Sequence, residues 1–144
     1  MTQRSRIALG LWLLLGGCSS HQCQLDDDLR LFAGDGAIDC GIAGVKTDRA
    51  AVDQCASEAF GAHKAFMARY ADADGSKLVT AVASNSDGAL KIFRWNSPCG
   101  DSSCSSVTDV QECVVPTLKM MTSDDANVLP FDCGSLGLPE RICN

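Results

Sequence analysis

Cysteine is the residue type with the most chemistry to offer in this sequence of 144 residues. The nine cysteines are Cys18, Cys23, Cys40, Cys55, Cys99, Cys104, Cys113, Cys133 and Cys143. A cysteine thiolate can bind a metal, attack an electrophile or pair in a disulfide. Zinc sites usually contain closely paired ligands such as C-x-x-C, and no two cysteines here have that spacing. The pattern therefore favours disulfides over a metal centre, and we expect no cofactor.

Histidine and the acidic clusters add little catalytic potential. His63 is interpreted as a partly buried residue of a helix, because it falls on the apolar face of a helical pattern. The run Asp26–Asp28 is interpreted as a solvated acidic turn, because a calcium loop needs oxygen ligands at set positions and a glycine between them. No nucleophile and base can be paired from the sequence. It therefore predicts neither an enzyme nor a metal site.

The first residues have the three zones of an export signal. Arg4 and Arg6 are followed by an uncharged apolar run, Ile7–Leu15, and then by the small residues Gly16 and Gly17. A basic start, a short apolar stretch and a small-residue cleavage site are typical of a secretory signal peptide. The apolar run is shorter than the roughly 20 residues that a membrane-spanning helix needs.

The cleavage site itself, Leu15-Gly16-Gly17-Cys18, resembles the lipobox of bacterial lipoproteins. The resemblance implies that cleavage follows Gly17 and that the thiol of Cys18 receives a diacylglycerol, with a palmitate-type chain on the new amino group. Two or more acyl chains hold a protein on a bilayer durably, whereas one chain does not. By the same resemblance, Ser19 in place of aspartate favours the outer membrane. We therefore expect an exported, membrane-anchored lipoprotein of the bacterial envelope.

The charge balance argues against a nucleic-acid partner. The chain has 12 basic and 18 acidic residues and a net charge of −6, and removal of the signal takes away Arg4 and Arg6, which leaves −8. Binding of phosphates requires clustered lysine and arginine. Nor is there a basic patch for anionic lipid, so attachment to the membrane would rest on the lipid at Cys18.

Lipidation of Cys18 would leave eight cysteines, an even number. In an exported chain, an even set of cysteines predicts a disulfide framework. The candidates are Cys23, Cys40, Cys55, Cys99, Cys104, Cys113, Cys133 and Cys143. Many pairings are possible, and we favour Cys133–Cys143 because it would close a short loop near the chain end.

Three segments are expected: a signal peptide at 1–17, a lipidated N-terminus and tether at 18–39, and a disulfide-rich α+β domain at 40–144. Within the domain, residues 47–71 carry apolar side chains at helical spacing. The residues on this face are Val52, Ala56, Ala59, Phe60, His63, Phe66, Met67 and Tyr70.

Strands are expected after this helix. Residues 77–83 and 89–95 flank the turn signal Asn85–Gly88 and predict a β-hairpin, in which Lys91, Phe93 and Trp95 share one face. Residues 107–115 predict a third strand that ends at Pro116, and residues 118–121 a possible fourth. The predicted fold is one amphipathic helix packed on a three- to four-stranded antiparallel sheet, stapled by disulfides.

The chain also resembles uncharacterised cysteine-rich lipoproteins of myxobacteria over about half of its length. The residues that carry this resemblance are Asp39-Cys40-Gly41, Cys55 with Ala59-Phe60, and Cys99-Gly100. The resemblance implies no activity. The sequence therefore predicts a lipid-anchored envelope protein that is a non-catalytic binding or structural module with an unknown protein or envelope ligand. The alternatives are a secreted hydrolase with an unrecognised site and a protease-inhibitor-like module.

Overall fold

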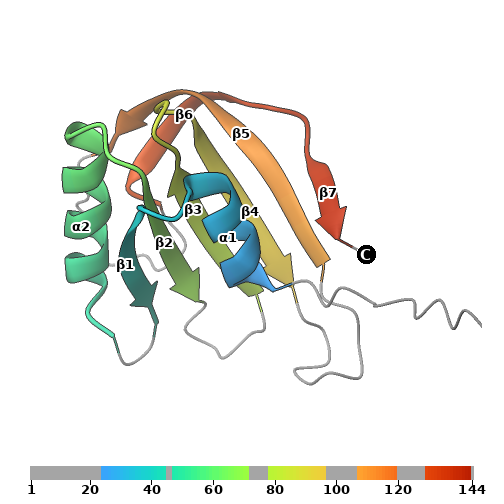
Figure 1. Ribbon diagram of the computed structural model, residues 1–144, viewed down its shortest axis with the longest axis horizontal. Helices are drawn as coiled ribbons and strands as arrows, with labels where there is room; N and C mark the ends of the chain where they lie inside the picture. The colour runs from blue at the N-terminus through green and yellow to red at the C-terminus, as the bar shows by residue number, and fades with distance from the viewer. Residues whose placement is uncertain (1–23, 45–46, 72–77, 97–106, 120–128, 144) are drawn as a thin grey trace, which may run out of the picture.

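The computed structural model describes residues 24–44, 47–71, 78–96, 107–119 and 129–143 (Figure 1). Its two helices are α1 (Leu25–Ala33) and α2 (Arg49–Gly61). Its strands are β1 (Ile38–Ala43), β2 (Phe66–Ala71), β3 (Leu78–Ser84), β4 (Leu90–Asn96), β5 (Val107–Leu118), β6 (Phe131–Leu136) and β7 (Glu140–Cys143). In the part of the chain that is described, neither helix has the length and apolar character needed to cross a membrane.

The strands form one mixed sheet in the order β1-β2-β3-β4-β5-β6, and β7 also pairs with β5. β1 is parallel to β2, and every other pair is antiparallel. β6 and β7 follow each other along the same edge of β5, since Cys113 pairs with Leu136 and Val110 pairs with Glu140. The long strand β5 therefore supports β4 on one side and two short strands on the other.

The expected fold class, one helix on a three- to four-stranded antiparallel sheet, is wrong. The sheet has seven strands, one of its pairs is parallel, and there are two helices. The missed strands β1, β6 and β7 have the sequences IDCGIA, FDCGSL and ERIC, which lack the alternation of β-branched residues that marks a strand. They are strands because neighbouring strands pair with them.

The predicted helix at 47–71 is correct only as far as Gly61. The amide of Lys64 donates to the carbonyl of Ala59 (2.9 Å) and that of His63 to Phe60 (3.0 Å), with His63 in the left-handed region at φ +53°. These bonds form the Schellman arrangement that ends a helix. The prediction overran because β2, the next element, is buried on both faces and therefore carries apolar residues without strand alternation.

Within residues 18–39, the segment expected to be a tether, the structure describes a helix, α1, over Leu25–Ala33. Leu25, Leu29 and Ala33 recur at intervals of four residues and are buried on the inner face of α1. The acidic run Asp26–Asp28 occupies the first turn of this helix, where the positive end of the helix dipole favours carboxylates.

The predicted hairpin is confirmed as β3 and β4. Ser84 pairs with Leu90, and the amide of Asn85 donates to the carbonyl of Ala89 (3.1 Å). The side chain of Asn85 accepts two amide hydrogens within the loop, and Gly88 has φ +81°. This is the three-residue loop in which a glycine is needed at the left-handed position. The third predicted strand is confirmed as β5, but it continues through Pro116 to Leu118 because β6 pairs with its end.

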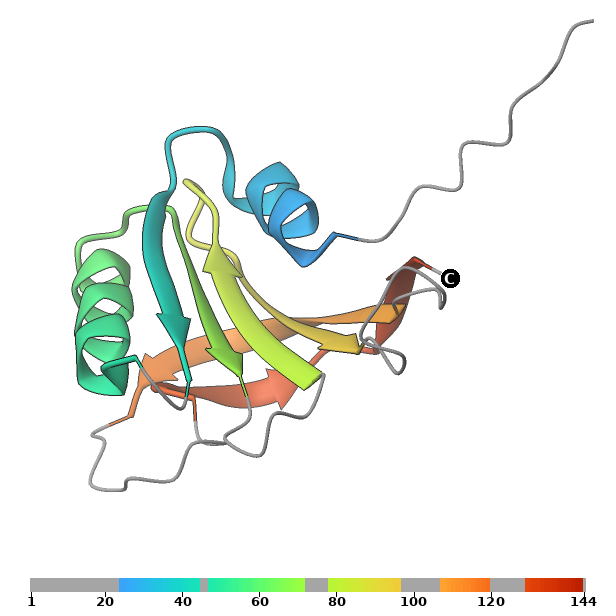
Figure 2. The same cartoon turned by 90° about the horizontal axis from the view of Figure 1, so that it is seen from below.

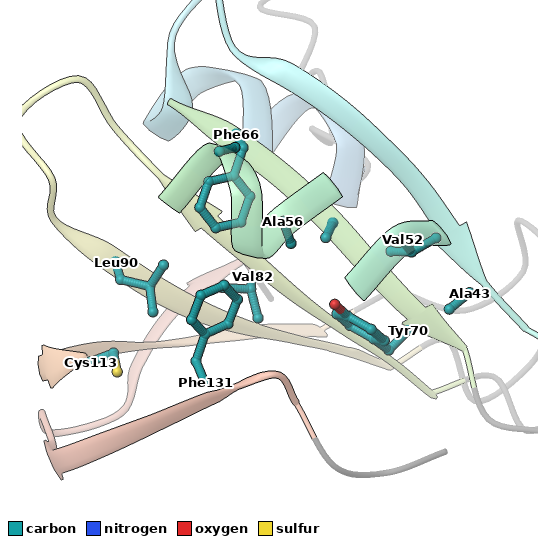
Figure 3. Close-up of a cluster of buried hydrophobic side chains, with 11 residues drawn as sticks. Ala43, Val52, Ala56, Phe66, Tyr70, Val82, Leu90, Cys113 and Phe131 are labelled. Atoms are coloured by element: carbon teal, nitrogen blue, oxygen red, sulfur yellow. The ribbon is translucent and has the colours of Figure 1, made fainter. Parts of the chain in front are cut away.

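Two separate hydrophobic cores lie on opposite faces of the sheet, because α2 and α1 cover opposite faces (Figures 1 and 2). The α2 core is drawn in Figure 3 and contains Phe66, Tyr70, Val82, Leu90 and Phe131 with small residues of α2. The α1 core has these members: Leu25, Leu29, Ala33, Met67, Ala81, Ala83, Phe93 and Val110.

The sheet curves so that β6 reaches α2. The ring of Phe131 on β6 lies 5.2 Å from that of Phe60 on α2 and 5.7 Å from that of Phe66 on β2, measured between centroids. These aromatic contacts close the α2 core on its far side. Among the described residues, no comparable element covers all of the opposite face, where α1 is only nine residues long.

Candidate functional site

A groove of about 390 Å³ lies beside α1, over β4 and β5, and reaches β7. We name it the α1–β7 groove. Its apolar lining consists of Leu31, Phe32, Phe93, Val110 and Ile142, and its charged lining consists of Asp28, Lys91 and Glu140. Its volume is in the range of sites that hold small molecules or one or two side chains of a partner.

The floor of the groove is built by strand pairing. Phe93 on β4 is directly opposite Val110 on β5, and these side chains are 2% and 5% exposed. The ring of Phe32 on α1 lies 6.0 Å from that of Phe93. Lys91, Phe93 and Trp95 share one face of β4, as the sequence predicted, and that face is the one that α1 partly covers.

The walls of the groove expose apolar side chains. Leu31 is 88% exposed and Ile142 is 42% exposed, although both lie beside the buried floor. Large apolar side chains gathered around a hollow are a feature of interaction sites, whereas scattered ones are common on any surface. The hollow beside α1 can therefore shelter an apolar group from water.

The charged lining belongs to three different elements. Burial raises the pKa of Asp28 on α1; a hydrogen bond from Thr108 opposes this shift, and the negative charge of Asp27 adds to it. The ammonium group of Lys91 lies over the ring of Phe32, 4.9 Å from its centroid. Glu140 on β7 is exposed and pairs in register with Val110 of the floor. The groove thus combines an apolar floor with both signs of charge.

Arg69 holds the α1 wall in place. Its Nε donates to Asp26 on α1 (2.6 Å) and its Nη1 donates to Asp39 on β1 (2.8 Å), while the residue is only 8% exposed. Burial opposes the charged form of Arg69, but the hydrogen bonds that it donates to both carboxylates outweigh this effect and raise the pKa of Arg69. The same pairing lowers the pKa of Asp39. This ion-pair cluster joins α1 to β1 and β2.

A second polar cluster lies on the other face, at the contact between α2 and β2. Arg49 pairs with Asp53 (3.1 Å), and its guanidinium lies 5.3 Å from the centroid of the Tyr70 ring. Burial first, and the charge of Asp53 second, raise the pKa of Tyr70. A hydrogen bond with the Asp53 carboxylate adds to this rise in the pKa of Tyr70. The raised pKa keeps the phenol of Tyr70 neutral, so the structure gives Tyr70 no role as a base. Because Arg49 belongs to α2 and Tyr70 to β2, the cluster instead anchors α2 to the sheet.

His63 lies in neither of these clusters. It is exposed in the turn after α2, contrary to the expectation of a half-buried helix residue. Together with Lys64 it borders a pocket of about 420 Å³ that is otherwise lined mostly by glycine, alanine and other small groups of the loop after α1. The other polar side chain among the described residues of this lining is Ser86, on the β3–β4 loop. No carboxylate is among them, so the described lining has no acid to orient His63 as a base.

Four of the eight candidate cysteines form two disulfides among the described residues. Cys40 on β1 bonds to Cys55 on α2, and Cys113 on β5 bonds to Cys133 on β6. The pairing favoured from sequence, Cys133–Cys143, is therefore wrong, because strand pairing brings Cys113 next to Cys133. The remaining disulfide candidates Cys23, Cys99 and Cys104 lie outside the described residues, as do the side chain of Cys143 and the predicted lipidation site Cys18.

Sequence reasoning missed the α1–β7 groove. The helical spacing of Leu25, Leu29 and Ala33 was a signal for α1, but the acidic run between them led to the interpretation as a turn. For Glu140 and Ile142 there was no local signal, because their position depends on the pairing of β7 with β5. In the described part of the chain, His, Cys, Asp and Glu residues form no group of three that could hold a metal ion.

Comparisons with protein-family models, with curated proteins and with solved structures found no match for this chain. We therefore infer its function from its own residues and from the geometry of the α1–β7 groove.

Proposed function

We propose that the chain is a lipid-anchored lipoprotein of the bacterial envelope whose folded domain is a non-catalytic binding module. The lipobox-like Leu15–Cys18 supports the anchor. The first described helix begins at Leu25, seven residues after Cys18. Seven extended residues span at most about 25 Å. A lipid on Cys18 would therefore hold the domain, and α1 in particular, close to the membrane surface.

The observation that carries the binding role is the α1–β7 groove. An exposed Leu31 stands next to a floor of almost fully buried Phe93 and Val110, and charged side chains line the same hollow. An apolar hollow with a few polar groups is the usual form of a ligand site. An occupant would cover the exposed apolar surface of Leu31 and Ile142, which stabilises a complex by roughly 25 cal/mol for each Å² removed from water.

The anchor is tested by expressing the full precursor in a bacterium that is fed labelled palmitate. We expect the wild-type protein to carry label and to sediment with the outer membrane. Cys18→Ser should lose the label and accumulate as precursor, because its side chain cannot form the thioether. Ser19→Ala is the matched control, since it changes the next residue and leaves the lipobox intact. Soluble wild-type protein that begins at Ser19 would overturn the anchor.

A further inference from the structure

The α1–β7 groove is lined by carboxylates from two different elements, α1 and β7. Asp28 comes from α1, and its carboxylate is close enough to Thr108 of β5 to accept a hydrogen bond from it. Glu140 comes from β7 and pairs in register with Val110, two residues further along the same face of β5. The two acidic side chains therefore both lie beside the apolar floor, Asp28 near Thr108 and Glu140 next to Val110.

The floor between these carboxylates is aromatic and aliphatic. Phe32 and Phe93 present their rings there, and the ammonium group of Lys91 already lies 4.9 Å from the centroid of the Phe32 ring. Aromatic faces attract cations as well as apolar groups. The position of Lys91 shows that a cation is accommodated on this floor.

The charge of Lys91 does not cancel the acidic groups. Its register partner on β5 is Glu112, an exposed acid on the same face of the sheet. With Asp28 and Glu140 of the lining, Glu112 makes three acidic side chains around Lys91, the one basic residue among those that line the groove. The excess of negative charge around an apolar hollow is complementary to a positively charged group that carries an apolar body.

We propose that the α1–β7 groove binds an organic cation with an apolar body, its ammonium group between Asp28 and Glu140 and its body on Phe93 and Val110. This inference rests on the proposed binding function, because it names the ligand chemistry of that same groove. Leu31 and Ile142 would close over the apolar body, which explains why these side chains remain exposed in the free protein.

Three probes of matched shape test the proposal: phenethylammonium, 2-phenylethanol and 3-phenylpropanoate, which differ in having a positive, neutral or negative head group. The mature lipoprotein is used in phosphatidylcholine vesicles, with empty vesicles as the baseline. Trp95, the only tryptophan after residue 17, packs against the α1 core, so its fluorescence reports binding. We expect phenethylammonium to bind about tenfold more tightly than 3-phenylpropanoate, with 2-phenylethanol between them.

Variants separate the charged contact from the apolar one. Glu140→Gln should weaken phenethylammonium about threefold and leave 2-phenylethanol unchanged, because Glu140 is exposed and contributes charge alone. Asp132→Asn, an exposed acid on β6 that does not line the groove, is the control and should change neither. Leu31→Ala should weaken all three probes alike.

The outcomes distinguish this inference from the proposed function. Equal affinity for the three probes, with all three sensitive to Leu31→Ala, would overturn the cationic preference and leave the binding module in place. No binding by any probe would overturn both. Loss of the lipid anchor would affect neither result, since the same titration can be made on a soluble chain.

Discussion

The two faces of the sheet are closed in different ways. On the α2 face, Phe66 is completely buried and stacks on Phe131, and the Cys40–Cys55 disulfide ties α2 to β1. On the other face, α1 is a nine-residue helix that contacts the sheet through Leu29 and its neighbours and is joined to it by the Arg69 ion pairs. Beside α1 the face remains open as the α1–β7 groove.

This difference indicates a division of roles. A covalent tie and stacked aromatic rings stabilise the fold on the α2 face, where Phe66, Leu90 and Phe131 are buried. The α1 face leaves Leu31 and Ile142 exposed beside a hollow, and apolar side chains gathered in this way are typical of interaction sites. Because the two faces have separate cores, changes in the groove need not disturb the core that holds the fold together.

The strongest test of the comparison is a large-to-small change in the α2 core. Phe66→Ala removes a ring that is 0% exposed and stacked on Phe131. We expect the free energy of unfolding to fall by about 3–5 kcal/mol, measured by denaturant unfolding with the disulfides intact. Phe32→Ala, which removes a partly buried ring from the other face, is the control and should cost less. If Phe32→Ala lowers the free energy of unfolding more than Phe66→Ala does, the α1 face contributes more to stability than the α2 face, contrary to this expectation.

An intermediate effect is expected from the ion-pair cluster that fixes α1. Arg69→Met leaves the carboxylates of Asp26 and Asp39 without their shared cation. Both carboxylates are about half exposed, so water compensates part of the loss and the cost should be about 1–2 kcal/mol. Hydrogen exchange should accelerate in α1 more than in α2. Arg94→Met, which removes an exposed arginine bonded to Gln111, should leave both helices unchanged.

The same cluster predicts a pH dependence. The hydrogen bond from Arg69 lowers the pKa of Asp39 in the folded protein, so the folded state holds its proton less tightly than the unfolded state does. The stabilisation is therefore complete above the ordinary aspartate pKa of about 3.9 and is lost as the pH falls through the lower folded value. Wild type and Arg69→Met should accordingly differ less in stability near pH 3 than at pH 7. A difference that is constant with pH would mean that Arg69 acts through packing alone.

The smallest change in unfolding free energy is expected for a substitution of Leu31, and Leu29 in the same helix provides the contrast. Leu29 and Leu31 both belong to α1, but Leu29 is 0% exposed and Leu31 is 88% exposed. Leu31→Ala should change the unfolding free energy by less than about 0.5 kcal/mol, whereas Leu29→Ala should cost about 2–4 kcal/mol. A large loss of unfolding free energy in Leu31→Ala would show that Leu31 stabilises the fold. Its exposure would then no longer support a role in ligand binding.

Some of the fold could be predicted because the signals are local. The conformation of the Asn85–Gly88 turn is stabilised by the Asn85 side chain, which accepts hydrogen bonds from nearby amides, and by Gly88 at φ +81°. A turn of this kind joins two antiparallel strands, so the strands on either side could be predicted with it. The start of α2 was also predictable, since Asp48 caps it by accepting the amide hydrogen of Ala50 (3.0 Å). Both features depend on residues within a few positions of each other.

Other features could not be predicted because the same pattern fits two structures. Phe66, Met67 and Tyr70 fit a continuing helix as well as a central strand, and only the packing of helices on both faces of β2 decides between them. Because the helix ends at Gly61 and β2 follows, His63 does not lie on a helix face. A residue predicted on a buried helix face became the exposed end of a helix cap.

The sequence by itself determined the local turns and caps, the lipobox-like Leu15–Cys18 that predicts an anchor, and a cysteine set suited to disulfides. Only the tertiary structure decided which cysteines pair, that β1, β6 and β7 are strands, and that Asp28 and Glu140 face the same hollow. The physical reason is the range of the interactions. A turn or a cap is selected by neighbours in the chain, whereas the α1–β7 groove exists because strand pairing brings β7 alongside β5 on the face that α1 covers.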